Sequence, residues 1–222
     1  GHSTLIAKAA NMAASRGMLV VASAGNSGAD SWHYISTPAD ADSILTVGAT
    51  DNLGNYAFFS SVGPAADGDI KPNVAAMGYQ TYVYTPFDSL PVQANGTSFS
   101  SPLIAGFAAC VWQLHPEWTA RQMYEEIQKS GHLYPYCDYA HGYGIPQASY
   151  FLSPTSKPQT DYCFLLEATD STRTSFHLDV FPVNDNDSLS ANLCLEEFPI
   201  YYQWVRPDQS IKHYGVMMRN TA

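Results

Sequence analysis

Residues 96–102 read GTSFSSP and lead into an apolar run with helical spacing. A helix is therefore predicted to begin near Thr97 or Ser98. The pattern predicts a buried helix, with Cys110 on its buried face and Ala105-Gly106 allowing close approach of a neighbour. Ser98 would stand in the first turn, beside free backbone N–H groups and the positive end of the helix dipole. The apolar positions are Leu103, Ile104, Phe107, Ala108, Val111 and Trp112.

A hydroxyl in this position suits a nucleophile whose attack creates an oxyanion, because the N–H donors are in place before the charge develops. Ser98 and Thr97 can equally be plain helix caps, which is the usual use of such residues. A second candidate is AGNSG at residues 24–28, at the end of an apolar strand run. The amide of Asn26 donates a hydrogen bond without carrying charge, which suits an oxyanion donor, although Asn beside Gly is also a common turn pair.

The elements around these motifs predict a parallel sheet covered by helices. An apolar face of Leu5, Ile6, Ala9, Ala10 and Ala13 predicts a helix over residues 5–13, capped by Ser3 or Thr4 and followed by Gly17. Strands are predicted over residues 18–24 and 44–49, and carboxyl ends of parallel strands carry ligand-binding loops. Residues 119–122, TARQ, form a capping-box pattern for a shorter helix that ends at Gly131.

The composition changes near residue 152. Fourteen of the fifteen glycines precede residue 161, and residues 152–160 are predicted to be a linker. Residues 161–222 contain four β-rich runs and predict a small β-rich domain of a size that is marginally stable alone. Tyr201, Tyr202 and Trp204 could form a carbohydrate-binding strip or could be packing residues.

Charge and hydropathy exclude several classes of function. The 222 residues include 10 Lys plus Arg and 20 Asp plus Glu, a net charge of −10, which argues against nucleic acid and anionic lipid as partners. No apolar run approaches the roughly 18 residues of a membrane span. Few charged residues and many tyrosines predict a secreted or periplasmic, cell-envelope protein. The chain begins at Gly1 without an initiator Met, so we expect a fragment or processed form.

Several ordered segments resemble the C-terminal half of the catalytic domain of subtilisin-like serine proteases, the subtilases. The resemblance covers residues 3–151 and departs from the family pattern at Met77, where a Pro is usual. Besides GTSFSSP and AGNSG, the matching segments are KPNVAA at residues 71–76, HPEWT at 115–119 and GYGIPQA at 142–148.

The resemblance implies a partial subtilisin-like α/β fold and a serine endopeptidase that acts on peptide or protein substrates. Ser98 would be the nucleophile that forms the acyl-enzyme, and Asn26 and the Ser98 backbone N–H would be the donors of the oxyanion hole. Ala24, Gly25 and Thr97 would border the substrate. The sequence leaves the oligomeric state open.

The family's catalytic Asp and His motifs lie upstream of the segments found here. His2 stands only 24 residues before Asn26, too close for the family's general base, and is better explained as a helix-end or solvent-facing residue. The chain is therefore expected to be inactive alone. The alternative is a non-catalytic remnant of a subtilase that binds peptides or has a structural function.

No cofactor is expected to be required, and no metal site is predicted. His132, Cys137, Asp138 and His141 have no zinc-site spacing. Asp67-Gly68-Asp69 and Asp185-Asn186-Asp187 offer oxygen atoms to calcium, which many subtilases bind, but each is more simply an Asx-rich turn. The most plausible disulfide joins Cys163 to Cys194.

Overall fold

The computed structural model describes residues 3–86 and 90–152, and the backbone of four strands between residues 162 and 217. Backbone contacts divide the chain into two compact units. One comprises Gly1–Pro158 with Tyr201–Val216, and the other comprises Gln159–Ile200 with Met217–Ala222. We describe each element within its own unit, and the domain boundary near residue 152 stays a prediction.

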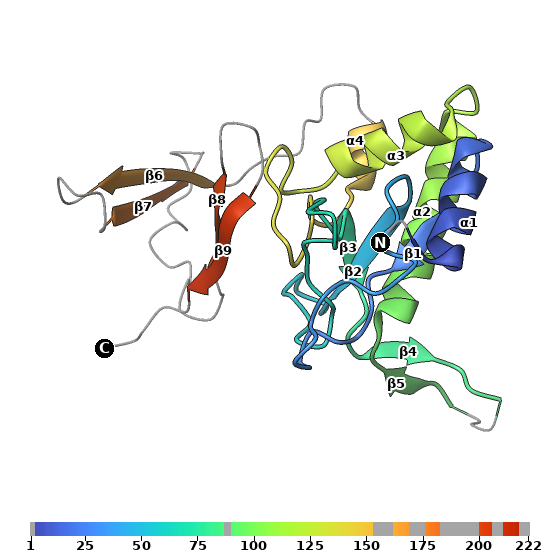
Figure 1. The fold of residues 1–222 in the computed structure, drawn as a ribbon, viewed down its shortest axis with the longest axis horizontal. Coiled ribbons are helices and arrows are strands. Elements are labelled where there is room, and N and C mark those ends of the chain that lie inside the picture. Colours follow the sequence, from blue (N-terminus) through green and yellow to red (C-terminus); the bar gives the residue numbers. More distant parts are fainter. Residues whose placement is uncertain are drawn as a thin grey trace. The chain divides into compact units, whose positions relative to one another are not determined.

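A three-stranded parallel sheet lies at the centre of the first unit (Figure 1). Its strands are β1 (Val21–Ser23), β2 (Leu45–Thr50) and β3 (Val74–Met77), in that order. All six residues of the central strand β2 are buried. This arrangement confirms the predicted parallel sheet, although β1 is shorter than the apolar run that predicted it.

Helices cover both faces of the sheet. Successive residues of a strand point to opposite faces, so neighbouring residues contact different helices. Val20 and Ala22 pack with α1 (Leu5–Ser15), whereas Leu19 and Val21 pack with the cluster formed by the other helices. Those helices are α2 (Thr97–Leu114) and α3 (Ala120–Lys129). The result is a layer of strands between two layers of helices.

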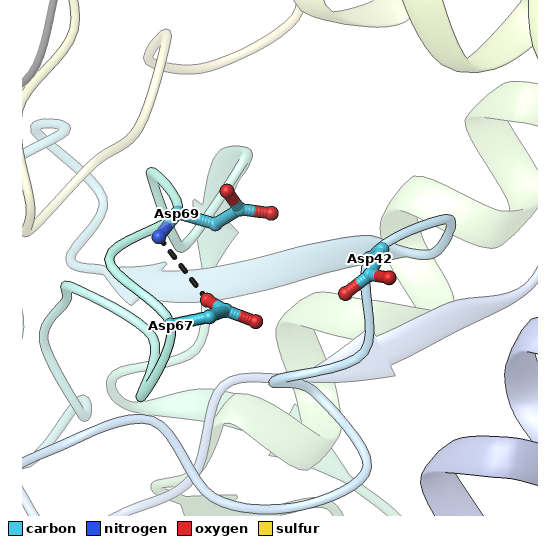
Figure 2. A group of neighbouring side chains, drawn as sticks. All are labelled: Asp42, Asp67 and Asp69. Atoms are coloured by element: carbon cyan, nitrogen blue, oxygen red, sulfur yellow. Dashed lines mark hydrogen bonds between the residues drawn. The ribbon is translucent and has the colours of Figure 1, made fainter. Parts of the chain in front are cut away.

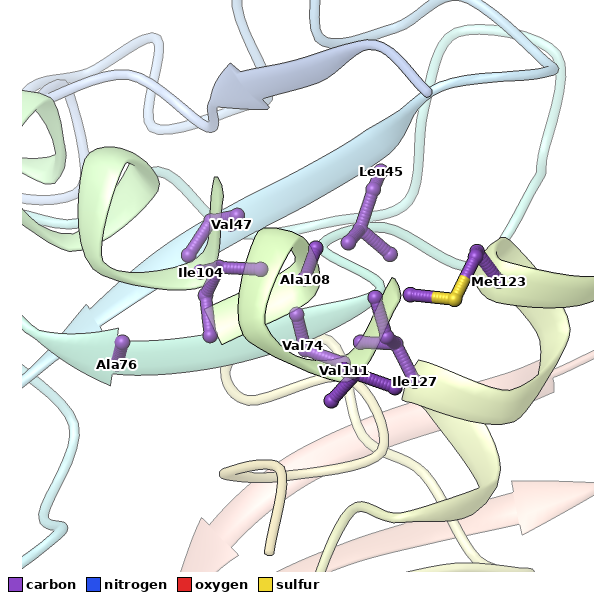
Figure 3. Close-up of a cluster of buried hydrophobic side chains, with 9 residues drawn as sticks. All are labelled: Leu45, Val47, Val74, Ala76, Ile104, Ala108, Val111, Met123 and Ile127. Atoms are coloured by element: carbon purple, nitrogen blue, oxygen red, sulfur yellow. The ribbon is translucent and has the colours of Figure 1, made fainter. Parts of the chain in front are cut away.

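The largest buried cluster joins β2 and β3 to α2 and α3 (Figure 3). Ile104, Ala108 and Val111 lie four and three residues apart, so they share one face of α2. The predicted burial of this helix holds for that face only: Leu103 is 51% exposed, Cys110 is exposed, and nothing lies within 4 Å of a Cβ built on Gly106. The cluster comprises Leu45, Val47, Val74, Ala76, Ile104, Ala108, Val111, Met123 and Ile127.

The helices α1 and α3 begin where the sequence predicts. Thr4 caps α1 by accepting a hydrogen bond from the Ala7 N–H, and Thr119 and Gln122 form a complete capping box at α3. The buried face of α1 differs from the predicted one, because Ala7 is buried while Leu5 is 86% exposed. Several alanines fit the helical period on more than one face, so the sequence pattern did not define the face.

The remaining elements include a hairpin that the sequence pattern did not predict. It consists of β4 (Thr81–Val83) and β5 (Val92–Ala94), which pair antiparallel. The short helix α4 (Ala148–Leu152) follows α3. The predicted β-rich runs are confirmed as strands: β6 (Tyr162–Ala168), β7 (Phe176–Pro182), β8 (Ile200–Val205) and β9 (Ile211–Met217).

Some predictions fall on the part of the chain that the structure does not describe. His2, Cys194 and Asp185-Asn186-Asp187 lie outside the described residues. The side chains of Tyr201, Tyr202 and Trp204 also lie outside them, since only the backbone of β8 is described. The Cys163–Cys194 disulfide and the carbohydrate-binding strip therefore stay predictions.

A lysine is buried beside the sheet. The Lys71 side chain is 1% exposed, and its Nζ donates to the Ile44 carbonyl at 2.8 Å and to Asn73 Oδ1 at 3.0 Å. Asn73 Oδ1 also accepts the Thr46 N–H at 2.8 Å, so Asn73 joins Lys71 to β2. Burial lowers the pKa of Lys71 to about 8, although the carboxylates of Asp69, Asp42 and Asp67 raise it in part.

We predict that stability rises with pH between about 8 and 10, because the unfolded chain then holds a proton that folded Lys71 has released. Below pH 8 both states are protonated, and the cost of burying the charge is fully present. Lys71→Met should remove this pH dependence of the free energy of unfolding, which amounts to about 3 kcal/mol over the pH range in which Lys71 titrates. Urea unfolding of both proteins at several pH values measures the difference, and parallel pH profiles would contradict the prediction.

Candidate active site

The predicted site residues come from two segments at one end of the sheet. Ala24, Gly25 and Asn26 follow the carboxyl end of β1, and Thr97 and Ser98 form the first turn of α2. The Ala24 N–H donates to the Val47 carbonyl at 2.9 Å, so the parallel pairing of β1 and β2 continues into the loop. The sheet thereby positions the start of this loop.

Asn26 and Thr97 are joined by a set of hydrogen bonds that we call the Asn26–Thr97 clasp. Asn26 Oδ1 accepts from the Thr97 N–H at 2.9 Å and from Thr97 Oγ1 at 2.9 Å. Thr97 Oγ1 in turn accepts from the Gly25 N–H at 3.2 Å. Because the carbonyl end of the Asn26 amide holds both donors, its Nδ2 end is left for other acceptors.

Ser98 is exposed beside this clasp. The neighbouring N–H groups of Thr97 and Phe99 donate to Asn26 Oδ1 and to the Gly96 carbonyl. Among residues 3–86 and 90–152, the Ser98 backbone N–H and the Ser98 hydroxyl have no hydrogen-bond partner. The start of α2 thus presents one free hydroxyl and one free backbone donor on the same residue.

Gly25 lies where two other loops meet. Its φ is +113°, and a Cβ at this position would approach Ser36 Oγ to 2.5 Å and Ser61 Oγ to 2.8 Å. The Ser61 N–H donates to the Gly25 carbonyl at 2.9 Å, and Ser61 Oγ accepts from the Ser27 N–H at 3.2 Å. A glycine is therefore required both by the backbone angle and by the close approach of these serines.

Two of the predicted site residues, Ala24 and Thr97, are buried. Ala24 packs with Ile35 and Ala39 beneath the loop. Thr97 is 1% exposed, while Asn26 and Ser98 are exposed. In the described structure, Ala24 and Thr97 therefore support the site from below, and Asn26 and Ser98 form its surface.

The structure gathers three carboxylates that could hold a metal ion (Figure 2). Ligand atoms of Asp42, Asp67 and Asp69 lie within 4.8 Å of one another, and all three residues are exposed. The sequence singled out Asp67 and Asp69 but not Asp42, which comes from a distant loop. Exposed acidic groups commonly gather without an ion, so this group does not by itself define a calcium site.

Hydrogen bonds within the loop between α3 and α4 involve Asp138, His141 and His132, which belong to the group with irregular zinc spacing. Asp138 Oδ1 accepts the N–H groups of Ala140 and His141, and Asp138 Oδ2 lies 3.0 Å from His141 Nδ1. His132 Nδ1 accepts the Ile145 N–H at 2.9 Å. In the described part of the chain these side chains form no group of three or more metal-ligand atoms. His141 is buried in this loop, which its sequence neighbours did not indicate.

The chain belongs to the subtilase family, whose model matches residues 1–144. It is 41% identical over 128 residues to Subtilisin BL and to Subtilisin Savinase of Lederbergia lenta, covering 58% of this chain and 44% of each relative. The solved structure of an S41 psychrophilic protease matches with a TM-score of 0.56 and 31% identity, covering 67% of this chain and 54% of that one. Sphericase gives a TM-score of 0.55, 28% identity and the same coverages. The chain therefore spans less than half the length of these two subtilisins.

Replacement of Thr97 tests the Asn26–Thr97 clasp. Thr97→Val keeps the shape but removes the hydroxyl, leaving the Gly25 N–H and Asn26 Oδ1 each without one partner. We expect a loss of about 1–2 kcal/mol in the free energy of unfolding. Thr97→Ser keeps the hydroxyl and should lose less. Denaturant unfolding measures both variants, and an equal loss in the two would contradict the clasp.

Proposed function

We propose that this chain supplies the nucleophile and the oxyanion hole of a secreted serine endopeptidase of the subtilase family. The observation that supports this most is the exposed Ser98, whose free hydroxyl and free N–H directly follow Thr97, the residue that holds the Oδ1 end of the Asn26 amide. Donors fixed before the reaction stabilise developing charge without reorganisation. The Ser98 hydroxyl would then act as the nucleophile, and the Ser98 N–H and Asn26 Nδ2 would act as the two oxyanion donors.

In the proposed reaction, Ser98 Oγ attacks the carbonyl carbon of the peptide bond. Its proton passes to a histidine base supplied, together with the Asp that orients it, by sequence outside this chain. Asn26 Nδ2 and the Ser98 N–H donate to the oxyanion. The C–N bond then breaks as the base returns the proton to the leaving amine, and water hydrolyses the acyl-enzyme by the same steps.

The residues around these groups would hold the substrate in place. We propose that Gly25, which has no side chain, lets the peptide backbone approach Asn26. Thr97 and Ala24 would act from beneath, Thr97 by fixing Asn26 and Ala24 by filling the space under the loop. All three were predicted to border the substrate, and the proposal assigns direct contact to Gly25.

We further propose that this chain has little activity by itself. Without a base, oxyanion stabilisation and binding leave a rate of at most about 10³ to 10⁴ over water. The α2 helix supports the need for further sequence: it contains no charged residue, yet Leu103 and Leu114 are 51% and 53% exposed. An uncharged helix face of this kind suits burial against other polypeptide.

Secretion is proposed from composition and family. Charged residues make up only 14% of the chain. None of the helices in the described residues is both long and apolar enough to cross a membrane. Nothing favours a periplasmic or cell-envelope location in particular. No cofactor enters the proposed reaction, because side-chain and backbone groups supply every step.

Labelling by a fluorophosphonate tests the proposed function in the full-length protein, which would contain the upstream Asp and His. We expect covalent labelling of Ser98 and none in Ser98→Ala. Asn26→Leu, which removes the Nδ2 donor together with the Oδ1 that accepts from Thr97, should lower kcat by at least about 10² to 10³, a magnitude established on subtilisin itself. Absence of labelling in a folded full-length protein would favour the non-catalytic remnant, either a peptide-binding or a structural one.

Metal removal tests the absence of a required cofactor. Dialysis against EDTA should leave the rate of Ser98 labelling unchanged at temperatures well below unfolding, because no metal takes part in the proposed reaction. The unfolding midpoint is measured in parallel, so that a loss of structure is not mistaken for a loss of chemistry. A labelling rate that falls in the folded protein and returns with added calcium would contradict the proposal.

A further inference from the structure

The β4–β5 hairpin leads directly into the candidate nucleophile. β5 ends at Ala94, and α2 begins at Thr97, so two residues separate the hairpin from the helix that carries Ser98. Figure 1 shows the hairpin projecting beyond the sheet next to the beginning of α2. Any peptide that lies across Ser98 in an extended form could therefore continue along this hairpin.

The base of the hairpin is fixed to the nucleophile turn. The Gly96 N–H donates to the Gly78 carbonyl at 2.8 Å, and the Gln80 N–H donates to Asn95 Oδ1 at 2.7 Å. A Cβ on Gly78 would approach the Gly96 carbonyl oxygen to 2.8 Å, so these two backbone segments are in close contact. The position of β4 is thereby tied to that of Ser98.

One face of the hairpin is aromatic and exposed. Exposure alternates from residue 81 to residue 86, as expected for an extended strand with one face in solvent. Tyr82 and Tyr84 fall on the same exposed face, at 69% and 76% exposure, and Leu90 on the returning segment is 74% exposed. The described residues of the hairpin, 78–86 and 90–97, contain no charged side chain, although the whole chain carries a net charge of −10.

The hairpin also has free strand edges. Within the described residues, β4 pairs only with β5, and β5 pairs only with β4. An unpaired edge presents backbone N–H and C=O groups to which an extended peptide can add as a further strand. Backbone hydrogen bonds to this edge would bind a peptide of any sequence, whereas the tyrosines would favour peptides with particular side chains.

We propose that the tyrosine face of the β4–β5 hairpin is a substrate-recognition surface that selects an aromatic or large aliphatic side chain a few residues from the scissile bond. This inference rests on the proposed endopeptidase function and specifies its substrate class. Tyr82 lies opposite Gln93, five residues before Ser98. At no more than about 3.3 Å per residue, the stretch from Gln93 to Ser98 spans at most roughly 17 Å, and the step across the strand pair to Tyr82 adds about 5 Å. Tyr82 therefore lies within about 22 Å of Ser98, the reach of about seven residues of extended peptide.

The test compares cleavage of peptide series by the full-length protein. In each series one position within about seven residues of the scissile bond carries Phe, Leu or Ser. We expect one position at which Phe and Leu raise kcat/KM roughly tenfold over Ser, and loss of this preference in the double variant Tyr82→Ser, Tyr84→Ser. The matched control is Tyr136→Ser, which removes a tyrosine that is 71% exposed in the loop between α3 and α4. The control should keep the preference.

The outcomes separate the two proposals. Unfolding midpoints check that all variants are folded. If the wild-type protein is not labelled by a fluorophosphonate, the proposed function fails. If it is labelled and cleaves peptides but shows no such preference, or keeps its preference in the Tyr82→Ser, Tyr84→Ser variant, the recognition surface is overturned while the endopeptidase remains.

Discussion

The carbonyl oxygen of one asparagine side chain holds the candidate site together. Asn26 Oδ1 accepts two hydrogen bonds from Thr97, and through them the loop after β1 is joined to the first turn of α2. The same contact orients the Asn26 amide and uses up the N–H of Thr97. The next N–H along the turn, that of Ser98, is a free donor among the described residues. One interaction therefore orients the Asn26 amide next to the turn that carries Ser98.

The rest of the unit supports this contact. The parallel pairing of β1 with β2 fixes where the loop begins, and the apolar face of α2 packs on β2 and β3 to fix where the helix begins. Gly25 allows the loops that contain Ser36 and Ser61 to close over it. Hydrogen bonds of the buried Lys71 and Asn73 join the loop before β3 to β2. Burial of the Lys71 ammonium group lowers the free energy of unfolding.

The sequence predicted the layers of the fold and the two motifs, because hydrophobic period and capping residues act locally. Thr119 and Gln122 predict the start of α3, and residues 96–102 predict the start of α2. The face of α1 could not be predicted, since its alanines fit more than one face. The apolar pattern of α2 predicts a buried Cys110, whereas this residue is exposed. The Thr97 contact with Asn26 spans 71 residues, and the meeting of Asp42 with Asp67 and Asp69 depends on loop paths. Neither has a local signal in the sequence.

The central claim is that Asn26 and Ser98 together bind an oxyanion. A crystal structure of the full-length protein with a peptide aldehyde tests it most directly, because the aldehyde forms a tetrahedral adduct with the nucleophile. The account predicts a covalent bond from Ser98 Oγ to the aldehyde carbon, with the adduct oxygen about 2.7–3.1 Å from Asn26 Nδ2 and from the Ser98 backbone nitrogen. An adduct on another residue, or an oxygen directed away from Asn26 into solvent, would contradict it.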